Sequence, residues 1–504
     1  MEDLILAAQQ FHDWRVVLAL LVGSIGGVII GAIPGVGPPV AIAIILPATF
    51  SMEPLVGLTM MLGIYGASMY GGALPAVLFN TPGTPVNALT TYDGYPITKN
   101  GEPMRAVTLA YSASFFGGII GIIALIFFAP VLANAAAHFG AREIFLTAML
   151  ALVLVVVTHR GKIIPAAMLT AFGMFLATIG LDRSTYSQRY TFEQSWLSSG
   201  IDLIVVVSGL FALSQAFILL MGSDKQQKVE AIQGSVFRGM KEIFRYKRVA
   251  GAGSMFGVVM GIIPGVGEFL AQFLSYNYAK NTSKNPELFG KGSPEGLVAC
   301  EAANNPVPAA ALVPLLSLGI PGEALTAMML SVFYVHNVIP GPTLFAEHMD
   351  FVLALYLSLL IMNVIVLLFL MFATNRLLMV MRIPDRFLGL LILILGFVGV
   401  YTLRNSITDC FIAAIFGLFG VILHRLKLPF VPIILGMILG GIMESRLRVA
   451  MARIDSPLDF INRPISAVLF FIIVVVVVSS LVSTLTNFKA QRTLLKNKSI
   501  PMSE

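Results

Sequence analysis

Charged residues are scarce in this chain. Only 12% of its 504 residues are Asp, Glu, Lys or Arg, whereas 57% are hydrophobic, and the mean hydropathy is +0.88. Soluble domains carry roughly 25% charged residues, because their surfaces must be solvated. No single water-soluble core absorbs this much apolar sequence. The composition therefore excludes a soluble protein, and we expect no nucleic-acid partner.

Reactive and metal-binding groups are also sparse. The two cysteines, Cys300 and Cys410, both lie in apolar segments, which excludes a disulfide framework or a cysteine metal cluster. The six histidines have no ligand spacing, and neither a His-Glu-x-x-His nor a Gly-x-Ser-x-Gly motif occurs. A phosphate-binding loop ending in Lys-Ser/Thr is absent as well. We therefore predict no enzyme and no cofactor, and ATP hydrolysis within this chain is not expected.

Long apolar runs are what the sequence has instead. Several are long enough to cross about 30 Å of hydrocarbon. These are residues 16–33, 106–132, 144–158, 163–181, 201–221, 350–373 and 465–486. They are continuous rather than alternating, which excludes a membrane β-barrel. The sequence predicts an all-α polytopic membrane protein with about 12 to 15 membrane segments. The short segment 429–443 has basic residues on both sides, so it is either a re-entrant hairpin or an exception to the charge rule.

One peptide occurs twice. Residues 28–37, Val-Ile-Ile-Gly-Ala-Ile-Pro-Gly-Val-Gly, return at 258–267 with seven of ten positions identical. A second pair, residues 75–83 and 314–322, shares two prolines and a glycine at the same intervals. The two motifs lie nine residues further apart in the second half, and the polar stretch 281–295 is the expected site of the additional loop.

Charge orients the two copies. The segment 222–248 is rich in Lys and Arg, which places it in the cytoplasm. Alternation of the apolar runs then places Met1 and the loop 182–200 outside. We therefore predict two inverted membrane repeats, joined by this basic linker. Their boundaries are 1–221 for the first repeat, 249–486 for the second repeat with an extra C-terminal helix, and 487–504 for a cytoplasmic tail.

Pro-Gly pairs inside apolar segments predict broken helices or re-entrant hairpins. Proline removes a backbone donor and glycine permits positive φ, so one half-helix ends and another begins. Half-helix N-termini attract anions and unwound carbonyls coordinate cations, as in secondary transporters. The predicted substrate-binding residues are Asn80, Thr81, Gly83, Thr84, Asn87, Asn304, Asn305, Gly319, Gly322 and Thr326. The predicted cation-binding residues are Pro34, Gly35, Gly37, Pro264, Gly265, Gly267 and Ser317, and no metal is expected beyond a possible Na⁺.

The acidic residues near these motifs predict a function less specifically than the Pro-Gly pairs do. Glu268 and Glu323 follow the breaks and are expected to cap helix N-termini. Glu301 is a coupling carboxylate, a residue at a helix mouth or a residue paired in a loop. Asp93, in Tyr-Asp-Gly-Tyr-Pro, predicts a turn. Three glycines have the spacing for close helix contact and are assigned to packing: Gly23, Gly27 and Gly31.

A string of motifs resembles the large membrane subunit of tripartite tricarboxylate transporters. In the first half these are Tyr-Gly-Ala-Ser-Met-Tyr-Gly-Gly at 65–72, Asn-Thr-Pro-Gly-Thr-Pro at 80–85 and Asp-Gly-Tyr-Pro at 93–96. In the second half they are Pro-Glu-Gly at 294–296, Glu-Ala-Ala-Asn-Asn at 301–305, Leu-Gly-Ile-Pro-Gly at 318–322 and Pro-Gly-Pro-Thr-Leu-Phe at 340–345. The resemblance covers nearly the whole chain.

This resemblance implies a permease of the bacterial inner membrane that works with two partners, a small membrane subunit and a periplasmic solute-binding protein. It implies import of a carboxylate coupled to Na⁺ or H⁺. The chain departs from the family pattern at two places that fall at the expected cavity, Pro-Val-Pro at 306–308 and Glu-Phe-Leu at 268–270. These departures make citrate a weak prediction for the substrate. Other di- or tricarboxylates, including aromatic ones, are alternative substrates. An anion channel is one alternative function, and an intramembrane enzyme is a much weaker one.

Overall fold

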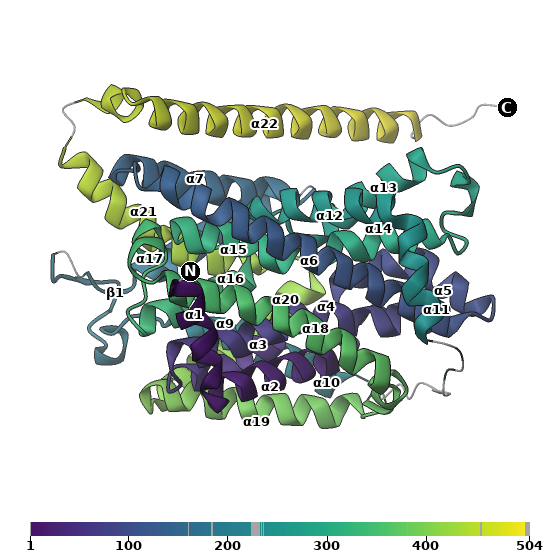
Figure 1. The fold of residues 1–504 in the computed structure, drawn as a ribbon. Coiled ribbons are helices and arrows are strands. Elements are labelled where there is room, and N and C mark those ends of the chain that lie inside the picture. The colour runs from purple at the N-terminus through teal and green to yellow at the C-terminus, as the bar shows by residue number, and fades with distance from the viewer. Residues whose placement is uncertain are drawn as a thin grey trace.

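The chain is helical almost throughout (Figure 1). The computed structural model describes residues 2–159, 161–182, 185–222, 232, 234, 236–380, 382–453 and 456–498. Within them the strands β1 (Gly180–Leu181) and β2 (Gln188–Arg189) form a small antiparallel pair. The all-α prediction is confirmed. Much of the predicted cytoplasmic linker, including Lys225 and Lys228, and residues 499–504 of the predicted tail lie outside the described residues.

The helices of the first half follow the predicted apolar runs. They are α1 (Glu2–Gln9), α2 (Trp14–Gly31), α3 (Gly37–Thr49), α4 (Pro54–Phe79), α5 (Thr90–Lys99), α6 (Pro103–Ala136), α7 (Ala141–Thr158), α8 (Ile163–Thr178), α9 (Leu203–Val207) and α10 (Ser214–Met221). Short helical turns accompany them: η1 (Gln10–His12), η2 (Pro85–Ala88), η3 (Ser195–Leu197) and the π-helical η4 (Ser208–Leu213), which joins α9 to α10.

The second half continues the helical pattern. It contains α11 (Val236–Glu242), α12 (Lys247–Ile262), α13 (Gly267–Thr282), α14 (Pro294–Asn304), α15 (Val307–Leu318), α16 (Ala324–Val335), α17 (Pro342–Glu347), α18 (Met349–Val380), α19 (Asp385–Arg404), α20 (Ile407–Arg425), α21 (Val431–Met451) and α22 (Pro464–Lys498). Its short turns are η5 (Ile243–Tyr246), η6 (Pro286–Leu288) and η7 (Pro457–Ile461). The described residues include nine helices long and apolar enough to cross a membrane and three shorter apolar ones.

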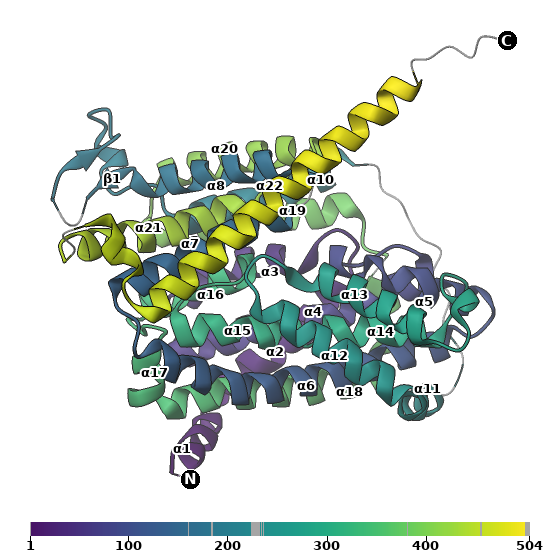
Figure 2. The same ribbon diagram turned by 90° about the horizontal axis from the view of Figure 1, so that it is seen from above.

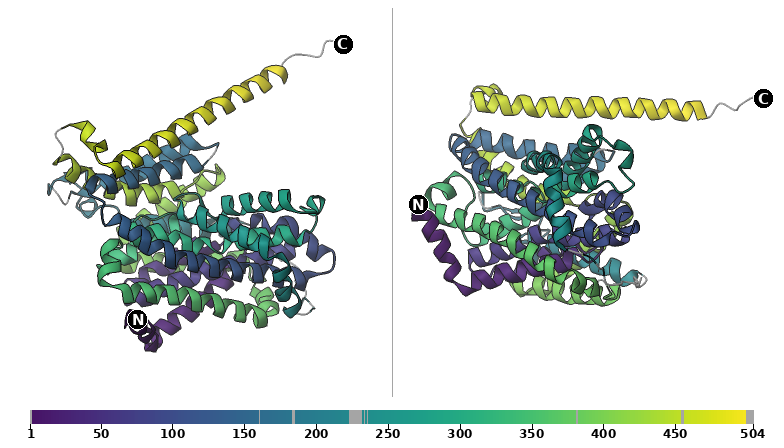
Figure 3. Two further views of the ribbon diagram at one scale, coloured as in Figure 1. Left: turned by 45° about the horizontal axis from the view of Figure 1, so that its top comes forward. Right: turned by 45° about the vertical axis from the view of Figure 1, so that its right-hand side comes forward.

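The helices form two packed groups (Figure 2). We call α2, α4, α6, α12, α14, α15 and α18 the central bundle, and α7, α8, α9, η4, α10, α19, α20 and α21 the flanking bundle. The helix α3 bridges them, because it packs on both α4 and α19. The short α1 and the long α22 lie on opposite sides of the body, with α22 running over α7 (Figures 2 and 3).

Small residues allow α2 and α4 to lie in close contact. A Cβ atom at Gly23, Gly27 or Gly31 would collide with the α4 backbone at Met60, Ile64 and Ser68, respectively. The prediction that these glycines serve packing is confirmed. Close backbone approach is how membrane helices associate in the absence of a hydrophobic driving force.

Of the two alternatives for segment 429–443, the structure excludes the re-entrant hairpin. Residues 431–443 belong to α21, which is one continuous helix packed on α7 and α8. The basic residues that follow it are partly neutralised by ion pairs: Arg448 contacts Asp182 at 2.7 Å and Glu444 at 2.6 Å. Arg189, on β2, also contacts Glu444 at 2.6 Å, so the same network holds the β-hairpin against α21.

Candidate functional site

The two helix breaks of each half are joined by one backbone hydrogen bond. The Gly35 amide donates to the Gly83 carbonyl at 3.2 Å, and the Gly265 amide donates to the Gly322 carbonyl at 2.7 Å. These are matching positions of the repeated motifs. The duplicated peptides therefore fold into duplicated local structures, in which a carbonyl of the second break satisfies an amide freed by the first.

Left-handed glycines shape the first break of each half. Gly35 and Gly37 have φ values of 87° and 62°, and their counterparts Gly265 and Gly267 have 79° and 67°. Only glycine adopts this region without a steric penalty, which is why each copy of the motif has a glycine at both positions.

The helices before the second breaks also end alike. Asn80 terminates α4 with φ 55°, and Gly319 terminates α15 with φ 67°. The next residue then donates its amide back across the turn, Thr81 to the Pro75 carbonyl and Ile320 to the Pro314 carbonyl, each at 3.4 Å. This pattern is the left-handed C-terminal cap of an α-helix.

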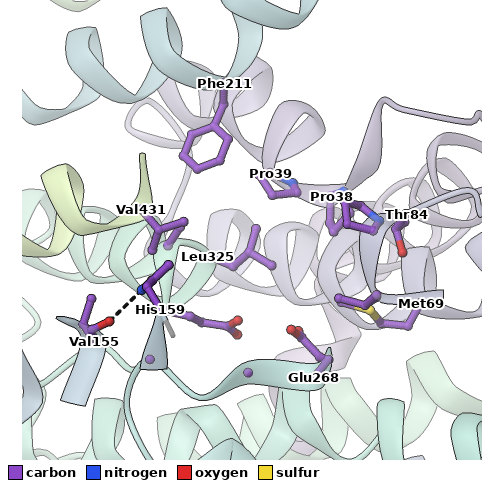
Figure 4. Close-up of a pocket in the computed structure, with 16 residues that line it drawn as sticks. Pro38, Pro39, Met69, Thr84, Val155, His159, Phe211, Glu268, Leu325 and Val431 are labelled. Carbon is purple, nitrogen blue, oxygen red and sulfur yellow. Dashed lines mark hydrogen bonds between the residues drawn. The ribbon is translucent and has the colours of Figure 1, made fainter. Parts of the chain in front are cut away.

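A cavity of about 240 Å³ lies between the breaks of the two halves (Figure 4). Its lining comes from both halves and from both helix bundles. The lining residues are Pro38, Pro39, Met69, Thr84, Pro85, Val86, Val155, His159, Phe211, Gly265, Gly267, Glu268, Glu323, Ala324, Leu325 and Val431. The helices α3, α13 and α16 begin at this cavity, and their N-termini carry partial positive charge. Because Pro38 and Pro39 follow Gly37 at the start of α3, this helix offers its dipole but few N–H donors.

Two acidic residues, Glu268 and Glu323, face this cavity and meet at one tyrosine. The Tyr65 hydroxyl lies 3.3 Å from Oε1 of Glu268 and also contacts Oε1 of Glu323. Figure 4 shows Glu268 pointing into the cavity from the start of α13. Both acids stand at helix N-termini, as predicted, but the Glu323 amide is capped by the Thr326 hydroxyl at 3.1 Å and its carboxylate is directed to Tyr65.

The rest of the lining is mainly apolar, and no Lys or Arg belongs to it within the described part of the chain. His159 is its only basic side chain there, and Nδ1 of this histidine lies 2.7 Å from the Val155 carbonyl (Figure 4). An anion in the cavity would therefore be held by helix N-termini, hydroxyl groups and one imidazole rather than by a guanidinium or ammonium group.

A buried polar network leads away from the cavity at Thr84. The Thr84 hydroxyl donates to Oδ1 of Asn87 at 2.5 Å, and Nδ2 of Asn87 donates to Glu301 at 3.4 Å. Glu301 also accepts hydrogen bonds from Thr90 at 2.5 Å and from Ser114 at 2.7 Å. This carboxylate is fully buried with three neutral donors, so it joins α14 to α5 and α6 and does not lie at a helix mouth.

The predicted turn at Asp93 is wrong. Asp93 lies in α5, is buried, and accepts hydrogen bonds from the Tyr276 hydroxyl at 2.9 Å and from the amides of Gly290, Gly292 and Ser293 at 2.7 to 2.9 Å. The three amide donors come from the loop before α14, in the polar stretch where the longer second half was expected to hold its insertion. Tertiary hydrogen bonds therefore replace the local ones that favour a turn.

The predicted site residues fall into several places. Thr84, Gly265 and Gly267 line the cavity, and Asn87 lies directly behind Thr84. The backbone bonds between the breaks involve Gly35, Gly83, Gly265 and Gly322. Pro34 and Pro264 precede the left-handed glycines, and Gly37 begins α3.

Other predicted residues lie away from this cavity. Ser317 donates to the Ala129 carbonyl at 2.8 Å, Thr326 caps Glu323, and Thr81 donates to the Phe79 carbonyl at 3.2 Å. The exposed Asn80 ends α4, and Gly319 lines a different cavity beside Tyr334 and Arg446. Asn304 and Asn305 are buried, and both Asn304 amide atoms and Nδ2 of Asn305 have no hydrogen-bond partner in the described part of the protein.

The sequence did not predict the meeting of Glu268, Glu323 and Tyr65. A signal was present, because the repeat alignment sets Glu268 against Pro38 and Glu323 against Thr84, so acids replace neutral residues in one half. No local signal indicated Phe211 or Val431, which reach the cavity from the flanking bundle.

Comparisons with known proteins agree with this architecture. Residues 17–435 match the model of the Tripartite tricarboxylate transporter TctA family. A protein of Agrobacterium vitis described as an uncharacterized 52.8 kDa protein in the TAR-I ttuC' 3' region is 33% identical over 470 residues, covering 92% of this chain and 93% of the relative. A second protein of that organism, described as an uncharacterized protein in the TAR-II ttuC' 3' region, is 32% identical over 214 residues, covering 42% of this chain and 88% of the relative.

No solved structure matches the chain. The family match spans most of the sequence, and the long relative covers nearly all of it. Together with the apolar helices, these matches identify a multi-pass membrane protein with a role in transport. This chain belongs to the Tripartite tricarboxylate transporter TctA family.

Proposed function

We propose that this chain is the large permease subunit of a tripartite system that imports a di- or tricarboxylate together with a cation. The observation that carries the proposal is the cavity between the paired breaks, where the N-termini of α3, α13 and α16 converge. Helix N-termini are ready-made sites for carboxylates. Broken helices that meet between two repeats are the usual substrate site of secondary transporters.

The partners follow from the family. A periplasmic solute-binding protein delivers the carboxylate, and a small membrane subunit completes the complex in the bacterial inner membrane. Within this chain, residues 1–221 and 249–486 act as two repeats of opposite orientation, with the basic linker 222–248 and the tail 487–504 in the cytoplasm.

Alternating access fits the position of the cavity at the boundary between the two bundles. Val155, Phe211 and Val431 line it from the flanking bundle, and Met69 of α4 lines it from the central bundle. Movement of one bundle against the other would open this boundary to one side of the membrane at a time. Coupling to an ion gradient supplies the energy.

The size and lining of the cavity restrict the substrate. A volume of about 240 Å³ with prolines, Phe211 and Leu325 in its wall suits a small carboxylate with an apolar body. A trianion such as citrate would bring three charges to a site with one imidazole and two acids. A dicarboxylate, aliphatic or aromatic, is therefore the favoured substrate class.

Counterflow tests the proposal. The complex is reconstituted with its small subunit in vesicles loaded with unlabelled carboxylate, and the binding protein and labelled carboxylate are added outside. We expect transient accumulation of label above equilibrium for at least one di- or tricarboxylate. Equilibration without overshoot for every carboxylate that the binding protein takes up would instead indicate an anion channel.

A further inference from the structure

The acid pair in the cavity has an unbalanced set of hydrogen-bonding groups. Tyr65, from α4, is fully buried, and its hydroxyl contacts one oxygen of Glu268 and one of Glu323. A phenol carries one hydrogen, and ionised carboxylates only accept. If both acids were ionised, one carboxylate oxygen would face the lone pairs of the phenol, and two negative charges would share one buried site.

One monovalent cation resolves this imbalance. A proton on either carboxyl group supplies the missing donor, and a sodium ion between the carboxylates would satisfy both. No Lys or Arg among the described lining residues offers a permanent counter-charge, and the basic side chain of that lining, His159, is engaged with the Val155 carbonyl. We infer that the coupling cation binds between Glu268 and Glu323, against the Tyr65 hydroxyl.

A second, independent feature points to the same place. Gln272 lies one turn after Glu268 on the same face of α13 and is fully buried. Neither atom of its amide has a hydrogen-bond partner in the described part of the protein. Helix side chains lean toward the N-terminus, so the Gln272 amide extends toward the turn that carries Glu268. A buried amide oxygen without a donor is a ligand suited to a hard cation.

The position of the acids explains why cation and substrate would bind together. Glu268 and Glu323 stand at the N-termini of α13 and α16, where the helix dipoles favour a negative charge. Two ionised carboxylates there repel a substrate carboxylate. A cation between them lowers this negative charge, so each ligand raises the affinity for the other, and the coupling is reciprocal. This inference rests on the proposed function, because it names the cation site of that same cavity.

Cation binding is measured first, on the purified full-length protein without any carboxylate. The probes are ²²Na⁺ in a scintillation assay for sodium, and an acid-base titration of the protein followed with a pH indicator for protons. We expect the wild type to bind one of the two cations and Glu268→Gln, Glu323→Gln and the double variant to bind it at least tenfold more weakly. Glu287→Gln, an exposed acid in the loop after α13, is the matched control and keeps wild-type binding.

Transport is measured second, with the reconstituted complex under a sodium gradient or a proton gradient alone. In the wild type, the gradient that drives accumulation identifies the cation, and the apparent KM for the carboxylate falls as that cation rises. In the Gln variants, accumulation drops at least tenfold and KM no longer depends on the cation. Tyr65→Phe keeps the packing of the ring and weakens cation binding without abolishing it.

The outcomes separate the two proposals. Wild-type cation binding that is unchanged in the double Gln variant overturns the cation site, whether or not the complex transports a carboxylate. Absence of both Na⁺ and H⁺ binding in the wild type overturns it as well. Loss of cation binding in the Gln variants supports the site, even if counterflow then shows that no carboxylate is carried and the proposed function fails.

Discussion

The breaks of the first half and those of the second half share a backbone but differ in charge. In both halves a left-handed glycine precedes a new helix, and one amide-to-carbonyl bond joins the two breaks. After Gly37 and Gly83 the first half has Pro38 and Thr84. After the matching glycines of the second half come Glu268 and Glu323. The two halves therefore share a backbone arrangement, but both acids that line the cavity come from the second half.

The halves also differ in how tightly their glycines are enclosed. A Cβ at Gly83 would collide with the Gly31 carbonyl and lie 2.7 Å from the Gly72 Cα, whereas a Cβ at Gly322 would lie 3.8 Å from its nearest neighbour, the Pro264 Cα. Equivalent positions of the motif are therefore not equivalent in packing. The predictions below test this comparison, from the largest expected effect to the smallest.

The largest effect is expected for Gly83→Ala. The added methyl group meets backbone on two sides, which cannot move aside as a flexible side chain would, so we expect a loss of about 3 kcal/mol or more of stability. Gly322→Ala is the matched variant and should change stability by less than about 1 kcal/mol. The measurement is thermal unfolding of the purified protein in detergent. Equal losses in the two variants would show that the halves enclose their second breaks alike.

The first breaks give a smaller contrast. Gly35→Ala and Gly265→Ala each place a side chain in the left-handed region, which costs about 1 to 2 kcal/mol. At Gly265 the methyl group would also lie 2.6 Å from the Val155 Cα of α7, whereas at Gly35 its nearest neighbour is Nε2 of Gln215 at 3.5 Å.

We therefore expect Gly265→Ala to be the more destabilising of the two by about 1 to 3 kcal/mol, again by thermal unfolding. It should also slow counterflow, because Gly265 lines the cavity at its contact with α7. A result in which Gly35→Ala is the worse variant would place the tighter contact in the first half.

The third prediction concerns the neutral side of the cavity. Thr84→Val removes the hydroxyl that donates to Asn87, leaving a buried amide oxygen without that donor, at a cost of about 1 kcal/mol. Thr81→Val is the control, since the Thr81 hydroxyl bonds only locally to the Phe79 carbonyl among the described contacts. We expect Thr84→Val to raise the KM for the carboxylate a few-fold and to leave its dependence on the cation intact. If that dependence is lost instead, the cation site is not confined to Glu268, Glu323 and Tyr65.

The smallest effect concerns the contact between the halves. Arg105, at the start of α6, binds Glu242 of α11 through two hydrogen bonds of 2.8 and 2.6 Å. This guanidinium holds the pKa of the Glu242 carboxyl below its usual value. A carboxyl group with a lowered pKa in the folded protein stabilises it above the ordinary pKa of about 4.5, and that contribution is lost as the pH falls through the lower, folded value.

Glu242→Gln should therefore cost about 1 kcal/mol at neutral pH and flatten the acid limb of the stability profile below about pH 5. Thermal unfolding from pH 3 to pH 7 checks this, with the exposed Glu287→Gln as the control. An unchanged acid limb would mean that this ion pair does not contribute to holding α11 against α6.

Sequence patterns predicted what depends on local physics. The apolar runs 16–33 and 350–373 correspond to α2 and α18 within a few residues at most ends, because length and hydropathy define a membrane helix. The glycine spacing at 23, 27 and 31 predicted the contact with α4, and the repeated Pro-Gly motifs indicated both pairs of breaks.

What depends on tertiary contacts was not predicted. Tyr65 lies in the middle of an apolar helix, and nothing nearby in sequence indicates that it meets Glu268 and Glu323. The helical state of Asp93 depends on donors about 200 residues away, so local propensity favoured a turn. The cavity wall at Phe211 and Val431 depends on how the two bundles dock, which no periodicity encodes.

The hydrogen bonds between the breaks also constrain the order of biogenesis. Gly35 and Gly83 are 48 residues apart, and Gly265 and Gly322 are 57 apart. A nascent chain that has emerged only as far as α4 holds the first break with its amide unpaired, and an unpaired amide in the bilayer is costly. Each half therefore completes its fold only when its later break has been synthesised. The smallest unit that can fold stably in the membrane during synthesis is a set of helices rather than a single hairpin.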